Sequence, residues 1–211
     1  MKRKPDKKTS RQTDSDNKRR KKVLLVPFLR RREYDDVTGA LYDMVIFQDT
    51  LTREWTLLSG GRKMTETAFE CALREIREET YGTFQIDEAC CSTLRFTTAH
   101  RPEQFRIRDK GRLILSDYDV YVFEMTPEEY AKRSARYKAA VLNLTSKQSR
   151  YGETVDVRLM SSSDIASAYM SNAEDSDNSV PLWDFIRHEC LKRVDDHILH
   201  FHDMELQRQA C

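Results

Sequence analysis

The chain has 211 residues, of which 39% are hydrophobic and 34% are charged, with a net charge of +1. This length suits one domain with appended segments. Its longest apolar stretches fall well short of a membrane-spanning helix, so we expect no membrane partner. The five cysteines are odd in number and form no Cys-x-x-Cys pair, which favours reduced thiols in an intracellular protein.

Positive charge is concentrated at the start of the chain. Residues 1–22 contain 11 Lys and Arg against three Asp, whereas the remaining 189 residues carry a net charge of −7. A basic segment without aromatic residues cannot bury enough surface to fold. We therefore predict a disordered arm over residues 1–21, followed by a single domain over 22–211. The two basic clusters of the arm suggest a bipartite nuclear-import signal or a nucleic-acid contact, with a solubilising tail as the alternative. Nuclear localisation is expected, with the cytoplasm as the other possibility.

Short apolar or alternating runs predict the strands of the domain. They are Lys22–Phe28, Leu41–Phe47, Glu54–Leu58, Ser92–Thr98, Leu113–Leu115, Tyr118–Phe123 and Thr154–Met160. Helices are expected after the glycines at 60 and 61, as an insertion near 127–151, and from near Pro181 to the C-terminus. This order predicts the α/β class, as an α/β/α sandwich with a mixed sheet.

The helix after the glycines carries a dense carboxylate cluster. Thr67 and Glu70 match a capping box at its start. At 100° per residue, Glu75, Glu78 and Glu79 fall within a sector of about 100°. Like charges that close repel by roughly 0.2–0.5 kcal/mol per pair. A hard cation such as Mg²⁺, which prefers carboxylate oxygens, would turn this repulsion into a binding site. The alternative is a solvated acidic face.

The spacing from Gly60 to Glu79 resembles the Nudix box of nucleoside-diphosphate-X hydrolases, Gly-x5-Glu-x7-Arg-Glu-U-x-Glu-Glu, where U is a bulky aliphatic residue. The resemblance implies the Nudix-type sandwich and hydrolysis of a phosphoanhydride bond with Mg²⁺ or Mn²⁺. It also implies roles for the residues of the box. Glu78 and Glu79 are the core metal ligands, Glu75 binds metal or positions water, and a backbone carbonyl at Ser59 or Gly60 assists.

Arg74 lies one helical turn from both Glu70 and Glu78, so its guanidinium can fix their side chains, with Glu66 completing the brace. The chain departs from the family pattern at the end of the box. The closing glycine comes one residue late, at Gly82 instead of position 81, which is expected to change how the helix ends and to leave the carboxylates intact.

Further site residues are expected outside the helix. Many members of this family use a distant glutamate just before a late strand. Glu153 fits that context better than Glu124, Glu128 or Glu129, and is the candidate third catalytic residue beside Arg74 and Glu75. The candidate substrate-binding residues are Trp55, Arg62, Lys63 and Tyr151.

Several substrates are compatible with this chemistry. The basic arm and the basic residues between Tyr130 and Gly152 favour a polyanion, and the box loosely resembles the viral, poxvirus-type mRNA-decapping branch. Capped RNA is therefore the favoured substrate. The alternatives are a small nucleotide such as ADP-ribose or a dinucleoside polyphosphate, a diphosphoinositol polyphosphate, and a non-catalytic binding module. The intact carboxylates argue against the last.

Overall fold

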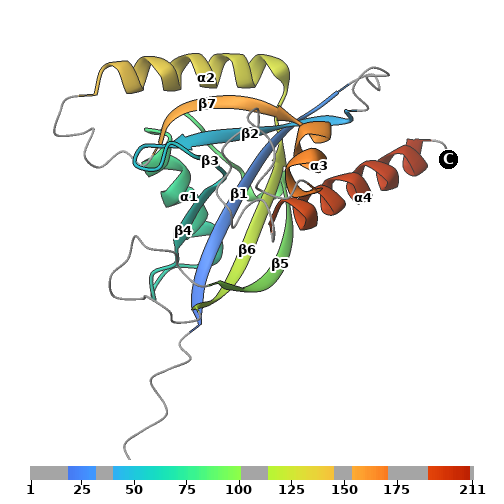
Figure 1. Cartoon of the computed structure of the whole chain (residues 1–211), viewed down its shortest axis with the longest axis horizontal. Helices are drawn as coiled ribbons and strands as arrows, with labels where there is room; N and C mark the ends of the chain where they lie inside the picture. Colours follow the sequence, from blue (N-terminus) through green and yellow to red (C-terminus); the bar gives the residue numbers. More distant parts are fainter. Residues whose placement is uncertain (1–18, 32–39, 101–113, 145–153, 171–189, 210–211) are drawn as a thin grey trace, which may run out of the picture.

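The computed structural model describes residues 19–31, 40–100, 114–144, 154–170 and 190–209, which form a sheet between two helical layers (Figure 1). The strands are β1 (Arg20–Arg30), β2 (Tyr42–Asp49), β3 (Trp55–Thr56), β4 (Leu58–Gly61), β5 (Cys91–His100), β6 (Ile114–Glu124) and β7 (Thr154–Ser161). The helices are α1 (Ala68–Glu79), α2 (Pro127–Leu142), α3 (Ser162–Met170) and α4 (Leu191–Gln209), with a short 3₁₀ turn at Glu88–Cys90. The predicted α/β class with a mixed sheet is confirmed.

β1 is the central strand of the sheet. It pairs in parallel with β6 along one edge. Its other edge pairs antiparallel with β4 at the start of the strand and with β2 at its end. β2 continues past β1 to pair with β3, and the other edge of β2 pairs with β7. β5 pairs with β6. A strand buried on both faces reads as a continuous apolar run, which explains the unbroken burial of β1 from Val23 to Leu29.

The side chains of β1 alternate between two cores. Leu24, Val26 and Phe28 belong to one core, which α3 and α4 cover through residues such as Ile165 and Val194. Val23, Leu25 and Leu29 face the other core, which α1 and α2 cover. The predicted three layers are therefore present, with the carboxylate-rich helix on the second face.

The observed elements correct the sequence-based predictions at several boundaries. β1 begins at Arg20, so residues 20 and 21 of the predicted arm belong to the sheet, where they pair with β6. The predicted strand Glu54–Leu58 is divided at Leu57 into β3 and β4. The two runs predicted near 113–115 and 118–123 form the single strand β6.

The helices also differ from the prediction. α3 was missed because its short serine-rich sequence lacks a clear apolar stripe. α2 ends at Leu142, and the rest of the predicted insertion, from 145 onward, lies outside the described residues. The same holds for residues 1–18 of the arm and for the predicted helix start near Pro181. No helix in the described part of the chain is long and apolar enough to cross a membrane.

A buried polar relay joins α1, α2 and β7. The Tyr137 hydroxyl donates to Thr154 Oγ1 at 2.8 Å, and Thr154 Oγ1 donates to the backbone carbonyl of Glu79 at 2.6 Å. Tyr137 and Thr154 are both buried. Since the last turn of a helix leaves carbonyls without helical partners, this relay supports the end of the carboxylate-bearing helix.

We expect Tyr137→Phe to lower the free energy of unfolding by about 1 kcal/mol, because a typical intramolecular hydrogen bond contributes that amount. Urea denaturation of the full chain measures it. Tyr130→Phe, on the same helix, is the matched control and should change stability by less. Equal effects of the two changes would show that the relay does not support the fold.

Candidate active site

The start of α1 is fixed by local hydrogen bonds. Thr67 Oγ1 accepts from the backbone N–H of Glu70 at 3.1 Å, and the Glu70 carboxylate accepts from the backbone N–H of Thr67 at 2.7 Å. The predicted capping box is therefore confirmed. Cys71, Ala72 and Ile76 bury the apolar side of the helix against the sheet, which leaves its acidic side beside the glycines of β4.

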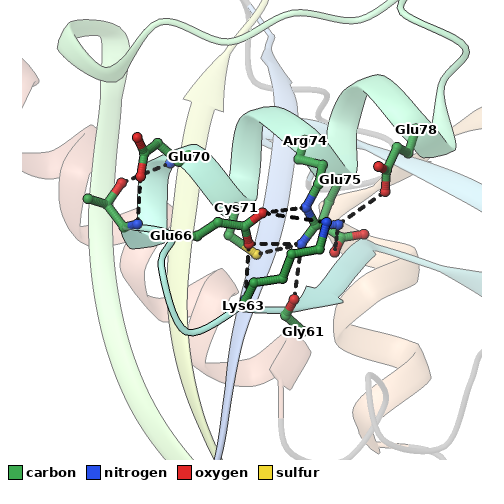
Figure 2. A network of polar contacts seen from close by, with 9 residues as sticks. Gly61, Lys63, Glu66, Glu70, Cys71, Arg74, Glu75 and Glu78 are labelled. Atoms are coloured by element: carbon green, nitrogen blue, oxygen red, sulfur yellow. Dashed lines mark hydrogen bonds and ion pairs between the residues drawn. The ribbon is translucent and has the colours of Figure 1, made fainter.

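Arg74 is the centre of a polar network around this helix (Figure 2). Its guanidinium donates to both Glu66 oxygens at 2.7 and 3.1 Å. It also donates to Glu75 at 2.6 Å and to Glu78 at 3.0 Å. A fifth hydrogen bond of 3.0 Å reaches the carbonyl of Gly61. The predicted contacts with Glu66 and Glu78 are present.

The predicted contact between Arg74 and Glu70 is wrong. The Glu70 carboxylate is instead used in the capping box, so it faces the first turn of the helix. Glu75 and the Gly61 carbonyl take part in the network in its place, and no spacing in the sequence predicts either contact. Adjacent residues on a helix do not usually face each other, which is why spacing alone does not predict the Arg74–Glu75 pair.

The network shifts the ionisation of its members. The hydrogen bonds from Arg74, and then from the backbone N–H of Lys63, lower the pKa of Glu66 to about 2. The hydrogen bond to Glu66 raises the pKa of Arg74 above its ordinary value. Burial, followed by the nearby Glu75 carboxylate, raises the pKa of the Cys71 thiol to about 11. Glu66 and Arg74 therefore remain charged, and Cys71 remains neutral, near neutral pH.

Glu75 lies directly against Gly60. A Cβ atom at Gly60 would be 1.8 Å from Cδ of Glu75 and 2.0 Å from its Oε1, whereas a Cβ at Gly61 would meet nothing within 4 Å. Any side chain at Gly60 would therefore collide with the carboxylate. The first glycine is required by the position of Glu75, and the second has no such neighbour.

The carboxylates of α1 differ in exposure. The side chain of Glu78 is 59% exposed and that of Glu75 is 9% exposed, and Glu79 as a residue is 4% exposed. Glu75 and Glu79 are one turn apart, so they lie on the same side of the helix. Burying such charges costs free energy unless partners compensate for it.

The donor chemistry fits a hard divalent cation. Glu75, Glu78 and Glu79 offer carboxylate oxygens, which Mg²⁺ prefers, and Gly60 leaves its Cα bare beside the Glu75 carboxylate. Within the described residues, no three acidic, histidine or cysteine side chains are already gathered as a metal site. The present geometry is the one that Arg74 imposes on Glu75 and Glu78.

The candidate substrate-binding residues occupy different surroundings. Arg62 lies 3.7 Å from Asp119 of β6, and Lys63 is 63% exposed, 3.8 Å from Glu66. Trp55 is only 8% exposed, and its ring is covered by the guanidinium of Arg158 at 4.1 Å. The structure thus places Arg62 and Lys63 in the segment before α1. Trp55, in β3, belongs instead to the core that α3 and α4 cover, on the opposite face of the sheet. Glu153 and Tyr151 lie outside the described residues.

The end of α1 accommodates the late glycine. Tyr81 has a φ of 54° and Gly82 a φ of 71°, and the backbone N–H of Gly82 donates to the carbonyl of Arg77 at 2.8 Å. Tyr81 therefore adopts the left-handed conformation in which glycine is usual. Its hydroxyl donates to the carbonyl of Thr154 at 3.0 Å, which anchors the turn to β7.

No protein-family model matches the chain, and no curated protein matches its sequence. Solved structures resemble it at low identity. A MutT/nudix family protein from Listeria innocua is 16% identical, with 88% of this chain and 97% of that chain covered and a TM-score of 0.48. C. elegans Ap4A hydrolase is 12% identical, with 86% and 98% covered and a TM-score of 0.45. E. coli dihydroneopterin triphosphate pyrophosphohydrolase is 12% identical, with 86% and 99% covered and a TM-score of 0.46.

The lowered pKa of Glu66 predicts a pH-dependent stability. A carboxyl whose pKa falls from an ordinary value of 4.5 to about 2 on folding stabilises the protein fully above pH 4.5. This contribution is lost as the pH falls toward 2. The difference in free energy of unfolding between wild type and Glu66→Gln should therefore be constant above about pH 5 and shrink below pH 4.5. Denaturant titrations across this range measure it. A constant difference down to pH 2.5 would contradict the Arg74–Glu66 interaction.

Proposed function

We propose that this protein is a metal-dependent hydrolase that cleaves a phosphoanhydride bond in a nucleoside-diphosphate-X substrate. The observation that carries the proposal is the Glu75 carboxylate. It lies on the bare Cα of Gly60 and accepts a hydrogen bond from Arg74, on the same helix as Glu78 and Glu79. The Nudix-like spacing predicts a metal site at these carboxylates, and a solvated acidic helix face would not need a glycine at position 60.

The metal-binding residues in this proposal are Glu75, Glu78 and Glu79, with the backbone carbonyl of Gly60. When bound, Mg²⁺ or Mn²⁺ would neutralise phosphate charge and lower the pKa of a water molecule that it binds. Arg74 orients Glu75 and Glu78 through hydrogen bonds of 2.6 and 3.0 Å. Glu66 fixes Arg74 in turn, because its carboxylate accepts two hydrogen bonds from the guanidinium. Glu153 is proposed as a further catalytic residue.

Substrate phosphates would meet Arg62 and Lys63, which leave β4 immediately after the glycines. Lys63 is well exposed, and its ammonium lies 3.8 Å from Glu66, so it can interact with a phosphate. Tyr151 is proposed to contact the substrate as well. For Trp55, whose ring already contacts Arg158, binding of a base would require the Arg158 side chain to move.

The proposed substrate is the mRNA cap, cleaved to a capped-nucleoside diphosphate and a 5′-monophosphate RNA. The basic residues 1–18 precede Arg19, and α2 adds the exposed Lys132 and Arg136. Both favour a long polyanion over a small nucleotide. Cleavage of capped RNA in the nucleus would also account for a nuclear-import signal in the arm. ADP-ribose, a dinucleoside polyphosphate and a diphosphoinositol polyphosphate are the alternatives that assays must include.

Glu79→Gln keeps the shape of the side chain and removes its negative charge. We expect it to lower hydrolysis by about two to four orders of magnitude, the scale of lost electrostatic stabilisation in a catalytic site. The measurement is product formation from cap-labelled RNA, ADP-ribose and diadenosine polyphosphate, each with Mg²⁺ and with Mn²⁺. The substrate that wild type cleaves most efficiently identifies the class.

Glu70→Gln is the matched control, because glutamine also completes a capping box and Glu70 lies outside the Arg74 network. It should leave the rate within about threefold of wild type. If Glu79→Gln retained the wild-type rate on every substrate that the protein cleaves, the proposed site would be wrong. A folded wild-type chain that cleaves none of them would favour the binding-module alternative.

A further inference from the structure

One row of residues crosses the sheet from the candidate active site. Gly60 of β4 pairs with Val23 of β1. On the other edge of β1, Val23 pairs with Asp119 of β6, and Asp119 pairs in turn with Arg95 of β5. Neighbouring strands are about 4.8 Å apart. Asp119 is therefore about 10 Å from the glycine that holds Glu75, with Arg95 one strand farther.

These side chains share a face with α1. Val23 and Tyr121 belong to the core under α1, and strand alternation places Asp119, two residues from Tyr121, on that same face. The cover of α1 ends at this point, since the ring of Phe69 in α1 packs on Tyr121 with centroids 5.6 Å apart. Beyond Tyr121 this face is more exposed in the described part of the chain, and the side chain of Arg95 is 82% exposed.

The charged side chains in this row and the next carry a net positive charge. Asp119 accepts a hydrogen bond from Nε of Arg95 and also lies 3.7 Å from Nη1 of Arg62. One carboxylate thus orients two guanidinium groups. Arg19 lies 3.5 Å from Asp117 in the next row, where Lys21 is the register partner of Asp117. This basic row contains four cations against two carboxylates and consists of Arg19, Lys21, Arg62, Arg95, Asp117 and Asp119.

Two cations of the basic row, Arg19 and Arg95, have exposed side chains, so their ion pairs are weak and they can exchange partners. A surface salt bridge contributes about 0–1 kcal/mol, whereas each phosphate that a cation neutralises releases condensed counterions and strengthens nucleic-acid binding. The backbone N–H of Arg62 donates to the carbonyl of Lys21 at 2.9 Å, so the loop after the glycines is joined to this row. Residues 1–18, which directly precede Arg19 in the sequence, contain seven Lys and Arg.

We infer that the basic row binds the phosphodiester chain of a single-stranded RNA and leads it from Gly60 and Glu75 toward β5. The position of the row predicts that a long substrate makes contacts with the protein that a small substrate does not make. Both reach the carboxylates of α1, but only a polynucleotide extends across β6 and β5. The inference rests on the proposed hydrolase function for the identity of the site to which the row leads.

The test compares wild type with Arg95→Glu and with the matched charge reversal Lys192→Glu. Lys192 is exposed on α4, which covers the opposite face of the sheet. The probe is an uncapped, fluorescently labelled RNA of about 20 nucleotides, longer than the roughly 4–16 nucleotides of one single-strand site. Fluorescence anisotropy over a range of salt concentrations measures binding, and it requires no hydrolysis.

We expect Arg95→Glu to weaken RNA binding at least fivefold and to reduce the log–log salt slope by about 0.7 for each lost phosphate contact. Lys192→Glu should stay within about twofold of wild type, because it changes only the net charge. In hydrolysis, Arg95→Glu should raise KM for a long capped RNA and leave a capped dinucleotide unchanged.

Equal weakening of RNA binding by the two variants would overturn the inference, because net charge alone would then explain it. The inference would also be overturned if Arg95→Glu bound RNA as tightly as wild type does. An equal rise of KM for the long and the short substrate would overturn it as well. The anisotropy result does not depend on Glu79. A protein that binds RNA through Arg95 but shows no effect of Glu79→Gln would refute the proposed hydrolase and leave the basic row in place.

Discussion

The contact between Arg74 and its acidic neighbours is the interaction on which the site depends. The guanidinium joins Glu66, Glu75 and Glu78 to the carbonyl of Gly61. Without a cation among them, these carboxylates would repel one another. A planar guanidinium offers five N–H donors in a fixed arrangement, and Arg74 uses it to connect Gly61 at the end of β4, Glu66 in the segment before α1, and the last turn of α1. Lysine carries the same charge without this geometry.

The pairing of β1 determines where the chemistry lies. β4 aligns with the first half of β1, which places Gly60 opposite Val23 and beneath α1. β6 aligns with the other edge of β1, which places Asp119 in the same row. A shift of either register by one residue would turn these side chains to the other face of the sheet. The register of β1 with β4 and β6 therefore positions the polar row as well as the core.

Local patterns in the sequence predicted the local structure, but not the contacts between distant segments. The capping box at Thr67 and Glu70 and the sector of Glu75, Glu78 and Glu79 follow from helical periodicity, because i to i+3 and i to i+4 relations are fixed within a helix. The Glu75–Gly60 contact and the pairing of Arg62 with Asp119 depend on how β4 and β6 align with β1. No spacing in the sequence encodes that alignment, and the break at Leu57 between β3 and β4 was missed for the same reason.

The most direct test of the account compares alanine at the two adjacent glycines, because both have backbone conformations that alanine can adopt and only one touches Glu75. We expect Gly60→Ala to displace the Glu75 carboxylate, to abolish Mn²⁺ binding in calorimetry, and to lower hydrolysis at least 100-fold. Gly61→Ala, whose added methyl meets nothing, should bind Mn²⁺ and remain within about threefold of the wild-type rate. Equal activity and equal metal binding in the two variants would contradict the claim that Glu75, seated on Gly60, is the centre of the site.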